Sequence, residues 1–111
     1  MIPYNDFYRL LTDVSDCPDF DAYLAEVGGS IPLDDADAVV RILSTIWEMG
    51  REGLTIKSIA TACGVSVRRA GIDCGIPQRT IENWASGTTV PPAWQLPLIA
   101  YATLSNTIDQ R

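Results

Sequence analysis

The stretch CGIPQRTIENWASG, residues 74–87, decides the fold of this chain. Gly75 favours the left-handed backbone that ends a helix. Pro77 suits the first position of the next helix, because it lacks the N–H that such a position leaves unpaired. Ile81 and Trp84 then lie three residues apart, on one face of that helix. The stretch therefore predicts the second half of a helix-turn-helix.

The opposite face of this helix, expected at about residues 77–86, is polar. Gln78, Arg79 and Asn83 carry side chains that are well shaped for paired hydrogen bonds to purine edges in the major groove of DNA. A short helix with an apolar inner face and such an outer face is what a recognition helix needs. We therefore expect these three residues to read bases.

The length and composition of the chain are those of an ordinary globular protein. The 111 residues suit about one domain, and the 47% hydrophobic and 20% charged fractions are typical values. No apolar run approaches the roughly 18 residues of a membrane span, and the first residues do not resemble a secretion signal. Cys17, Cys63 and Cys74 include no C-x-x-C pair and there is no histidine. We expect reduced thiols in a cytoplasmic protein, without a disulfide framework, metal or cofactor.

Charge divides the chain into two regions. Residues 1–53 hold eleven acidic residues and three arginines, a charge of −8, whereas residues 54–111 hold three acidic and five basic residues, a charge of +2. Such asymmetry indicates two roles in one chain. We expect 1–53 to be an acidic helical region for protein interaction or dimerisation, and 54–111 to be a helix-turn-helix region that faces phosphates.

The spacing of apolar residues predicts helices throughout. In the acidic region a first helix is expected after Asn5 as its N-cap, a second between Asp16 and Gly28, and the longest after Asp35. Later helices are shorter, and Ser66 is expected to cap one of them. No segment alternates with a period of two, so no strand is expected. The prediction is an all-α chain with about seven helices.

Two features of the second half need explanation. The sequences CGVSVRRA at 63–70 and CGIPQRTI at 74–81 echo each other, so either joint could be the one that faces DNA. Pro97 falls inside the closing helix, where proline removes a hydrogen bond and clashes with the preceding turn. We therefore expect residues 92–96 to form a separate turn or a kinked first turn, the regular helix to begin at Pro97, and Trp94 to fold back onto the core.

The pattern of the second half resembles the phage repressor and Cro (XRE-like) helix-turn-helix family. The resemblance covers about residues 54–105, includes the following stretch GTTVPPAWQLPLIAYATL, and is carried by Gly71, Gly75, Ile76, Ile81 and Trp84. Residues 1–50 resemble no family. The resemblance implies a λ-repressor-like helix-turn-helix in the C-terminal half, and the acidic helical region before it is then an N-terminal extension.

The same resemblance implies roles for individual residues. Gln78, Arg79 and Asn83 would read bases, and the DNA backbone would be contacted by Arg68, Arg69, Thr80 and Thr88. It also implies a homodimer on double-stranded, pseudo-palindromic DNA, as in regulators of phages or mobile elements. The family often has a small residue such as Ala where Gly71 stands, and a basic loop where residues 88–90 are uncharged.

Three functions compete at this point. The first is a sequence-specific DNA-binding transcriptional regulator. The second is an acidic protein-interaction module, namely an inhibitor, an antitoxin-like factor or a DNA mimic, in which the helix-turn-helix is a scaffold and the acidic half binds a basic partner; the net charge of −6 favours it. The third, an enzyme, has no histidine, no phosphate-binding glycine loop and no nucleophile with a plausible base. We therefore expect no catalysis.

Overall fold

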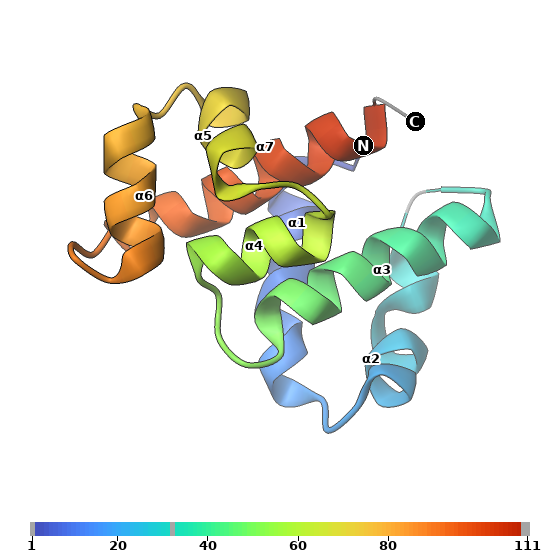
Figure 1. Ribbon diagram of the computed structural model, residues 1–111. Coiled ribbons are helices and arrows are strands. Elements are labelled where there is room, and N and C mark those ends of the chain that lie inside the picture. Colours follow the sequence, from blue (N-terminus) through green and yellow to red (C-terminus); the bar gives the residue numbers. More distant parts are fainter. Residues whose placement is uncertain (1, 32, 110–111) are drawn as a thin grey trace.

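All regular structure in the described part of the chain is helical (Figure 1). The computed structural model describes residues 2–31 and 33–109. Its α-helices are α1 (Tyr4–Asp13), α2 (Phe20–Val27), α3 (Ala36–Gly50), α4 (Ile56–Cys63), α5 (Val67–Cys74), α6 (Gln78–Ser86) and α7 (Gln95–Asp109). Two 3₁₀ turns, η1 (Val14–Asp16) and η2 (Gly28–Ser30), follow α1 and α2. The all-α prediction with about seven helices is confirmed for these residues.

Side-chain caps explain where several helices begin. The carboxylate of Asp35 accepts a hydrogen bond from the N–H of Asp37 at 3.0 Å and so starts α3. Thr55 and Ser58 cap α4 reciprocally, each hydroxyl accepting from the other residue's N–H. Ser66 starts α5 as expected. The caps at Asp35 and Ser66 confirm the sequence prediction, whereas the pair of Thr55 and Ser58 was not predicted.

Two expected starts in the acidic region are wrong. Asn5 lies inside α1, which is preceded by Pro3 without a side-chain cap. Asp16 belongs to the 3₁₀ turn η1, which directly follows α1, so it does not start α2. The cap of α2 is Asp19, whose extended backbone allows its carboxylate to accept from the N–H of Ala22 at 2.8 Å.

The start of α7 also differs from expectation. A turn precedes the helix, with the N–H of Gln95 donating to the carbonyl of Pro92 at 2.9 Å, but the helix begins at Gln95 rather than at Pro97. Pro97 is therefore the third helical residue, where an N–H has no intrahelical acceptor and none is lost. The side chain of Trp94 lies in the preceding turn and is 68% exposed. The expectation that it folds onto the core is wrong.

One hydrophobic core joins the acidic half to the rest of the chain. Helix α1 packs against α3 and α7, and α3 packs against α4. The ring of Tyr101 in α7 lies 5.2 Å from the rings of both Tyr4 and Phe7 in α1, and its hydroxyl donates to the carbonyl of Ile2. In Figure 1, α2 and α6 lie at opposite ends of the molecule, with this shared core between them.

Candidate nucleic-acid interface

The two glycine joints of the second half have nearly the same geometry. Gly64 and Gly75 both adopt the left-handed conformation, with φ of 69° and 70°. After Gly75, the N–H of Ile76 donates to the carbonyl of Gly71 at 2.9 Å, and the residue after Gly64 makes the equivalent bond at 3.0 Å. This closure satisfies carbonyls that a helix end leaves free. The repeated sequence is thus a repeated helix end.

The second joint brings its two helices unusually close. A Cβ placed on Gly71 in α5 would lie 2.9 Å from Cγ2 of Ile81 in α6, and Ile81 is fully buried. On the same face of α6, the half-buried ring of Trp84 packs against the core. Because Ile81 and Trp84 fix the inner face of α6, the orientation of its outer face is also fixed.

The outer face of α6 carries the residues expected to read bases. Gln78 and Arg79 are exposed in the first turn, and Asn83 is half-buried one turn later. The amide nitrogen of Gln78 donates to the carboxylate of Glu82 at 2.8 Å. Glu82, to which the sequence assigned no site role, therefore shares this face, orients Gln78 and places a negative charge among the candidate base-reading residues.

The residues expected to contact the DNA backbone are not equivalent. Arg69 forms an ion pair with Asp73, with Nε and Oδ1 at 3.1 Å, and the Asp73 side chain is only 6% exposed. Arg68 is exposed and forms no ion pair within the described residues. Thr80 is half-buried in α6, whereas Thr88 is exposed, and its hydroxyl lies 2.9 Å from that of Ser86, beyond the end of the helix. Arg68 is therefore the cation of α5 that a phosphate could engage without a competing carboxylate.

Several large apolar side chains near α6 in the sequence are exposed, which was not anticipated. No Asp, Glu, Lys or Arg occurs in residues 83–108. Within and beside this segment the large apolar side chains of Ile72, Val90, Trp94 and Leu98 are 60%, 86%, 68% and 43% exposed. We call these four residues the apolar patch. The long interval without charge was a signal for these exposed side chains, but the break expected at Pro97 led us to place Trp94 on the core.

The thiol of Cys74 lies beneath this surface. Its Sγ is 3.8 Å from the carbonyl of Ile99 and from the hydroxyl of Thr103, which is fully buried. Burial raises the pKa of the Cys74 thiol, an effect that the hydrogen bond with Thr103 partly offsets. Cys74 is thus a structural contact between α5 and α7, and its protonated form suits that role.

Comparisons of the chain with known protein families, with curated proteins and with solved structures find no match. Among the described residues, no group of three or more His, Cys, Asp or Glu side chains is placed to hold a metal ion. None of the helices in this part of the chain combines the length and the apolarity needed to cross a membrane.

Proposed function

We propose that this chain is a sequence-specific DNA-binding regulator of the repressor/Cro type. Helix α6 enters the major groove, where Gln78, Arg79 and Asn83 read bases. Arg68 with Arg69, and Thr80 with Thr88, then lie against the DNA backbone. The observation that carries this proposal is the tight crossing of α5 and α6 at Gly71, which leaves the polar outer face of α6 uncovered.

The chemistry of the outer face suits direct readout. An exposed guanidinium at Arg79 can donate two hydrogen bonds to a guanine edge, and an amide at Asn83 can pair with an adenine edge. Glu82 can accept from the amino group of cytosine, so its charge is compatible with a base-reading face. The hydrogen bond from Gln78 to Glu82 holds the two side chains in one arrangement before DNA arrives.

One copy of the chain offers few cations for contact with phosphates, which favours DNA binding by two copies together. The free energy of DNA binding comes largely from cations that neutralise phosphates. Arg69 is already paired with Asp73, and the chain carries a net charge of −6. A single copy is therefore expected to bind weakly, and two linked copies that read two half-sites would gain affinity together.

The apolar patch is the surface through which we propose two copies associate. Two chains of charge −6 repel each other wherever their acidic surfaces meet. Three of the four patch residues, Val90, Trp94 and Leu98, lie in residues 83–108, which carry no charge. Trp94 and Val90 belong to the segment that directly follows α6. A dimer formed there would keep both copies of α6 next to the two-fold axis, as adjacent half-sites require.

A second candidate function keeps the helix-turn-helix as a scaffold only. The observation that favours it is the acidic region of charge −8, together with the carboxylates of Asp73 and Glu82 beside the candidate DNA-contacting residues. In that case the acidic half binds a basic protein, as an inhibitor, an antitoxin-like factor or a DNA mimic would. The two functions differ in whether the chain binds duplex DNA.

An electrophoretic shift assay distinguishes DNA binding from the protein-interaction function. The whole chain is mixed with random genomic fragments at two salt concentrations, beside a variant in which Gln78, Arg79 and Asn83 are all replaced by Ala. We expect the native chain to retard a subset of fragments at low salt, and the variant to lose that preference. Failure of the native chain to retard any fragment at low salt would reject DNA binding and leave the protein-interaction function.

A further inference from the structure

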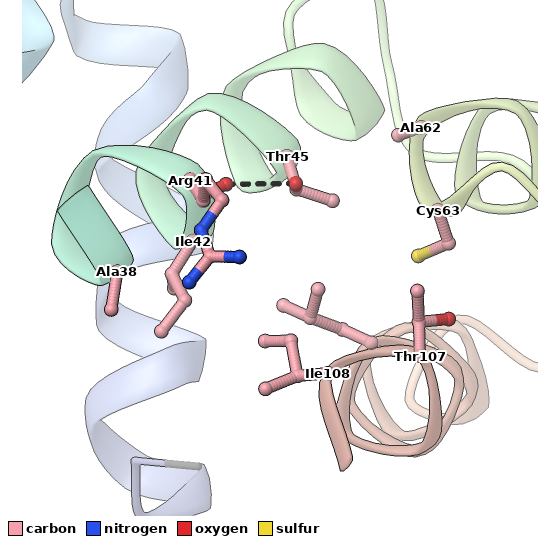
Figure 2. Close-up of a pocket in the computed structure, with 9 residues that line it drawn as sticks. Ala38, Arg41, Ile42, Thr45, Ala62, Cys63, Thr107 and Ile108 are labelled. Carbon is pink, nitrogen blue, oxygen red and sulfur yellow. Dashed lines mark hydrogen bonds between the residues drawn. The ribbon is translucent and has the colours of Figure 1, made fainter. Parts of the chain in front are cut away.

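A small cavity opens where the acidic half meets the helix-turn-helix half. Its volume is about 120 Å³, and Figure 2 shows it between α3, α4 and α7. It is lined by Ala38, Arg41, Ile42, Thr45, Ala62, Cys63, Leu104, Thr107 and Ile108. None of the functions proposed above uses this cavity.

The inner wall of the cavity is apolar. Ile42 and Leu104 are 4% and 2% exposed and lie on facing helices, with Ile108 one turn beyond Leu104. A cavity of roughly 150 Å³ with such a lining accepts a molecule the size of benzene. The space here is slightly smaller and is open on one side, so it suits a ring or a short branched chain with one end at the surface.

Arg41 supplies the charge at the open side. Its side chain is exposed and forms no ion pair with any described residue, and no Asp or Glu is among the described residues that line the cavity. In Figure 2 the guanidinium lies on the α3 side, across the space from Cys63 and Ile108. A ligand with an apolar body inside the cavity would reach this cation with a polar end.

The two threonine hydroxyls that line the cavity also favour a ligand with a negatively charged end. Thr45 donates its hydroxyl to the carbonyl of Arg41 at 2.8 Å, and Thr107 donates to the carbonyl of Thr103 at 2.8 Å. Because both protons are already used, these oxygens offer no donor that would replace Arg41. The guanidinium is therefore the group that decides the charge of a ligand, and it prefers a carboxylate.

We propose that this cavity binds a small organic carboxylate, with an aromatic ring or short branched chain between α3 and α7 and the carboxylate on Arg41. Such a ligand would contact the acidic half through α3 and the helix-turn-helix half through α4 and α7. Binding would stabilise the folded chain by mass action. This inference does not depend on DNA binding, and its test uses no DNA.

Isothermal titration calorimetry of the whole chain tests the proposal, with phenylacetate as the probe. Phenylacetamide has nearly the same shape without the charge, and phenethylamine has the opposite charge. We expect saturable binding of phenylacetate, binding of phenylacetamide about five- to tenfold weaker, and no binding of phenethylamine. Equal affinities for the three compounds, or no saturable binding of phenylacetate at millimolar concentration, would overturn the proposal.

Variants separate the two parts of the site. Arg41→Gln should weaken phenylacetate about five- to tenfold while leaving phenylacetamide unchanged. Ala62→Leu fills the cavity and should abolish binding of both, and Ala38→Leu provides a second filling variant if the first unfolds. Arg9→Gln, at an exposed arginine of α1 outside the cavity, is the matched control for charge. Unchanged phenylacetate affinity in Arg41→Gln, or in a folded filling variant, would show that the probe binds elsewhere.

Discussion

The Cβ position of Gly71 lies 2.9 Å from Cγ2 of Ile81, the closest approach that any glycine of the described chain would make through an added Cβ. Cγ2 is attached directly to the branched Cβ of a fully buried residue, so it cannot swing away as the end of a flexible side chain could. The absence of a side chain at position 71 therefore sets the distance between α5 and α6. The same contact sets the orientation of the candidate recognition helix.

Gly71→Ala is expected to destabilise the protein although alanine favours helices. Alanine gains about 0.5–1 kcal/mol over glycine inside a helix, whereas forcing a methyl group into a packed contact costs about 1–3 kcal/mol. We expect the free energy of unfolding in urea to fall by about 1 kcal/mol, the difference between these two effects. Gly29→Ala, where an added Cβ meets nothing within 4 Å, is the control and should cause no such loss. A more stable Gly71→Ala protein would contradict the close contact.

Tyr23 should make the fold sensitive to alkaline pH. Its hydroxyl is buried and donates to the carbonyl of Leu10 at 2.7 Å. Burial, and then the charge of Asp13, raise the pKa of Tyr23 well above its ordinary value in the folded state. Because the folded chain holds this proton more tightly than the unfolded chain, its contribution to stability is complete below the unfolded pKa of about 10 and declines as pH rises above it.

Tyr23→Phe removes both effects and so tests this assignment. The variant should lose about 1 kcal/mol of stability at neutral pH, because the Leu10 carbonyl loses its donor. It should also lose less of its stability between neutral pH and pH 11 than the native chain does. Thermal unfolding followed by circular dichroism at several pH values measures both quantities. Tyr8→Phe, at a residue that is 51% exposed, serves as the control, and an identical alkaline profile in Tyr23→Phe would contradict the prediction.

Three arginines should differ in their effect on DNA binding. Arg79→Ala should cost about 1–3 kcal/mol on the preferred site and relax one base preference, whereas Arg68→Ala should weaken all sequences alike and lower the salt slope by about one. Arg69→Ala should change the slope less, because Asp73 already neutralises that charge. Fluorescence anisotropy with a selected site and a scrambled site, at several salt concentrations, measures these effects. Equal losses from Arg79→Ala and Arg68→Ala on both sites would contradict the base-reading assignment.

Trp94→Gln should convert an associated chain into a monomer. The indole is 68% exposed in the apolar patch, and burying such a ring is among the strongest contributions to an interface. We expect sedimentation equilibrium to show a dimer for the native chain and a dissociation constant at least tenfold higher for the variant. Val40→Gln removes an exposed apolar side chain on α3, outside the patch, and should leave association unchanged. If both variants associate like the native chain, the patch is not the dimer surface.

Local signals account for most of the helices that the sequence predicts. Ser66, Gly75 and Gly87 mark helix ends through interactions within a few residues, and the structure has helix ends at all three positions. The buried face of α6, with Ile81 and Trp84, follows from spacing in the same way. The exposed positions of Gln78 and Arg79 follow from that face, although what they contact remains a prediction.

Other features depended on contacts between distant parts of the chain. Whether Trp94 lies inside or outside depends on where α7 begins, and periodicity does not distinguish a start at Gln95 from one at Pro97. The pairing of Arg69 with Asp73 is local, yet the burial of Asp73 that gives it significance comes from the packing of α5 on α7. Helix caps and the apolar faces of helices can be predicted from the sequence because the residues that form them are close together in it. The shared core around Tyr101, the 2.9 Å approach at Gly71 and the cavity beside Arg41 arose only when helices far apart in sequence packed together, since each needs atoms that no short segment contains.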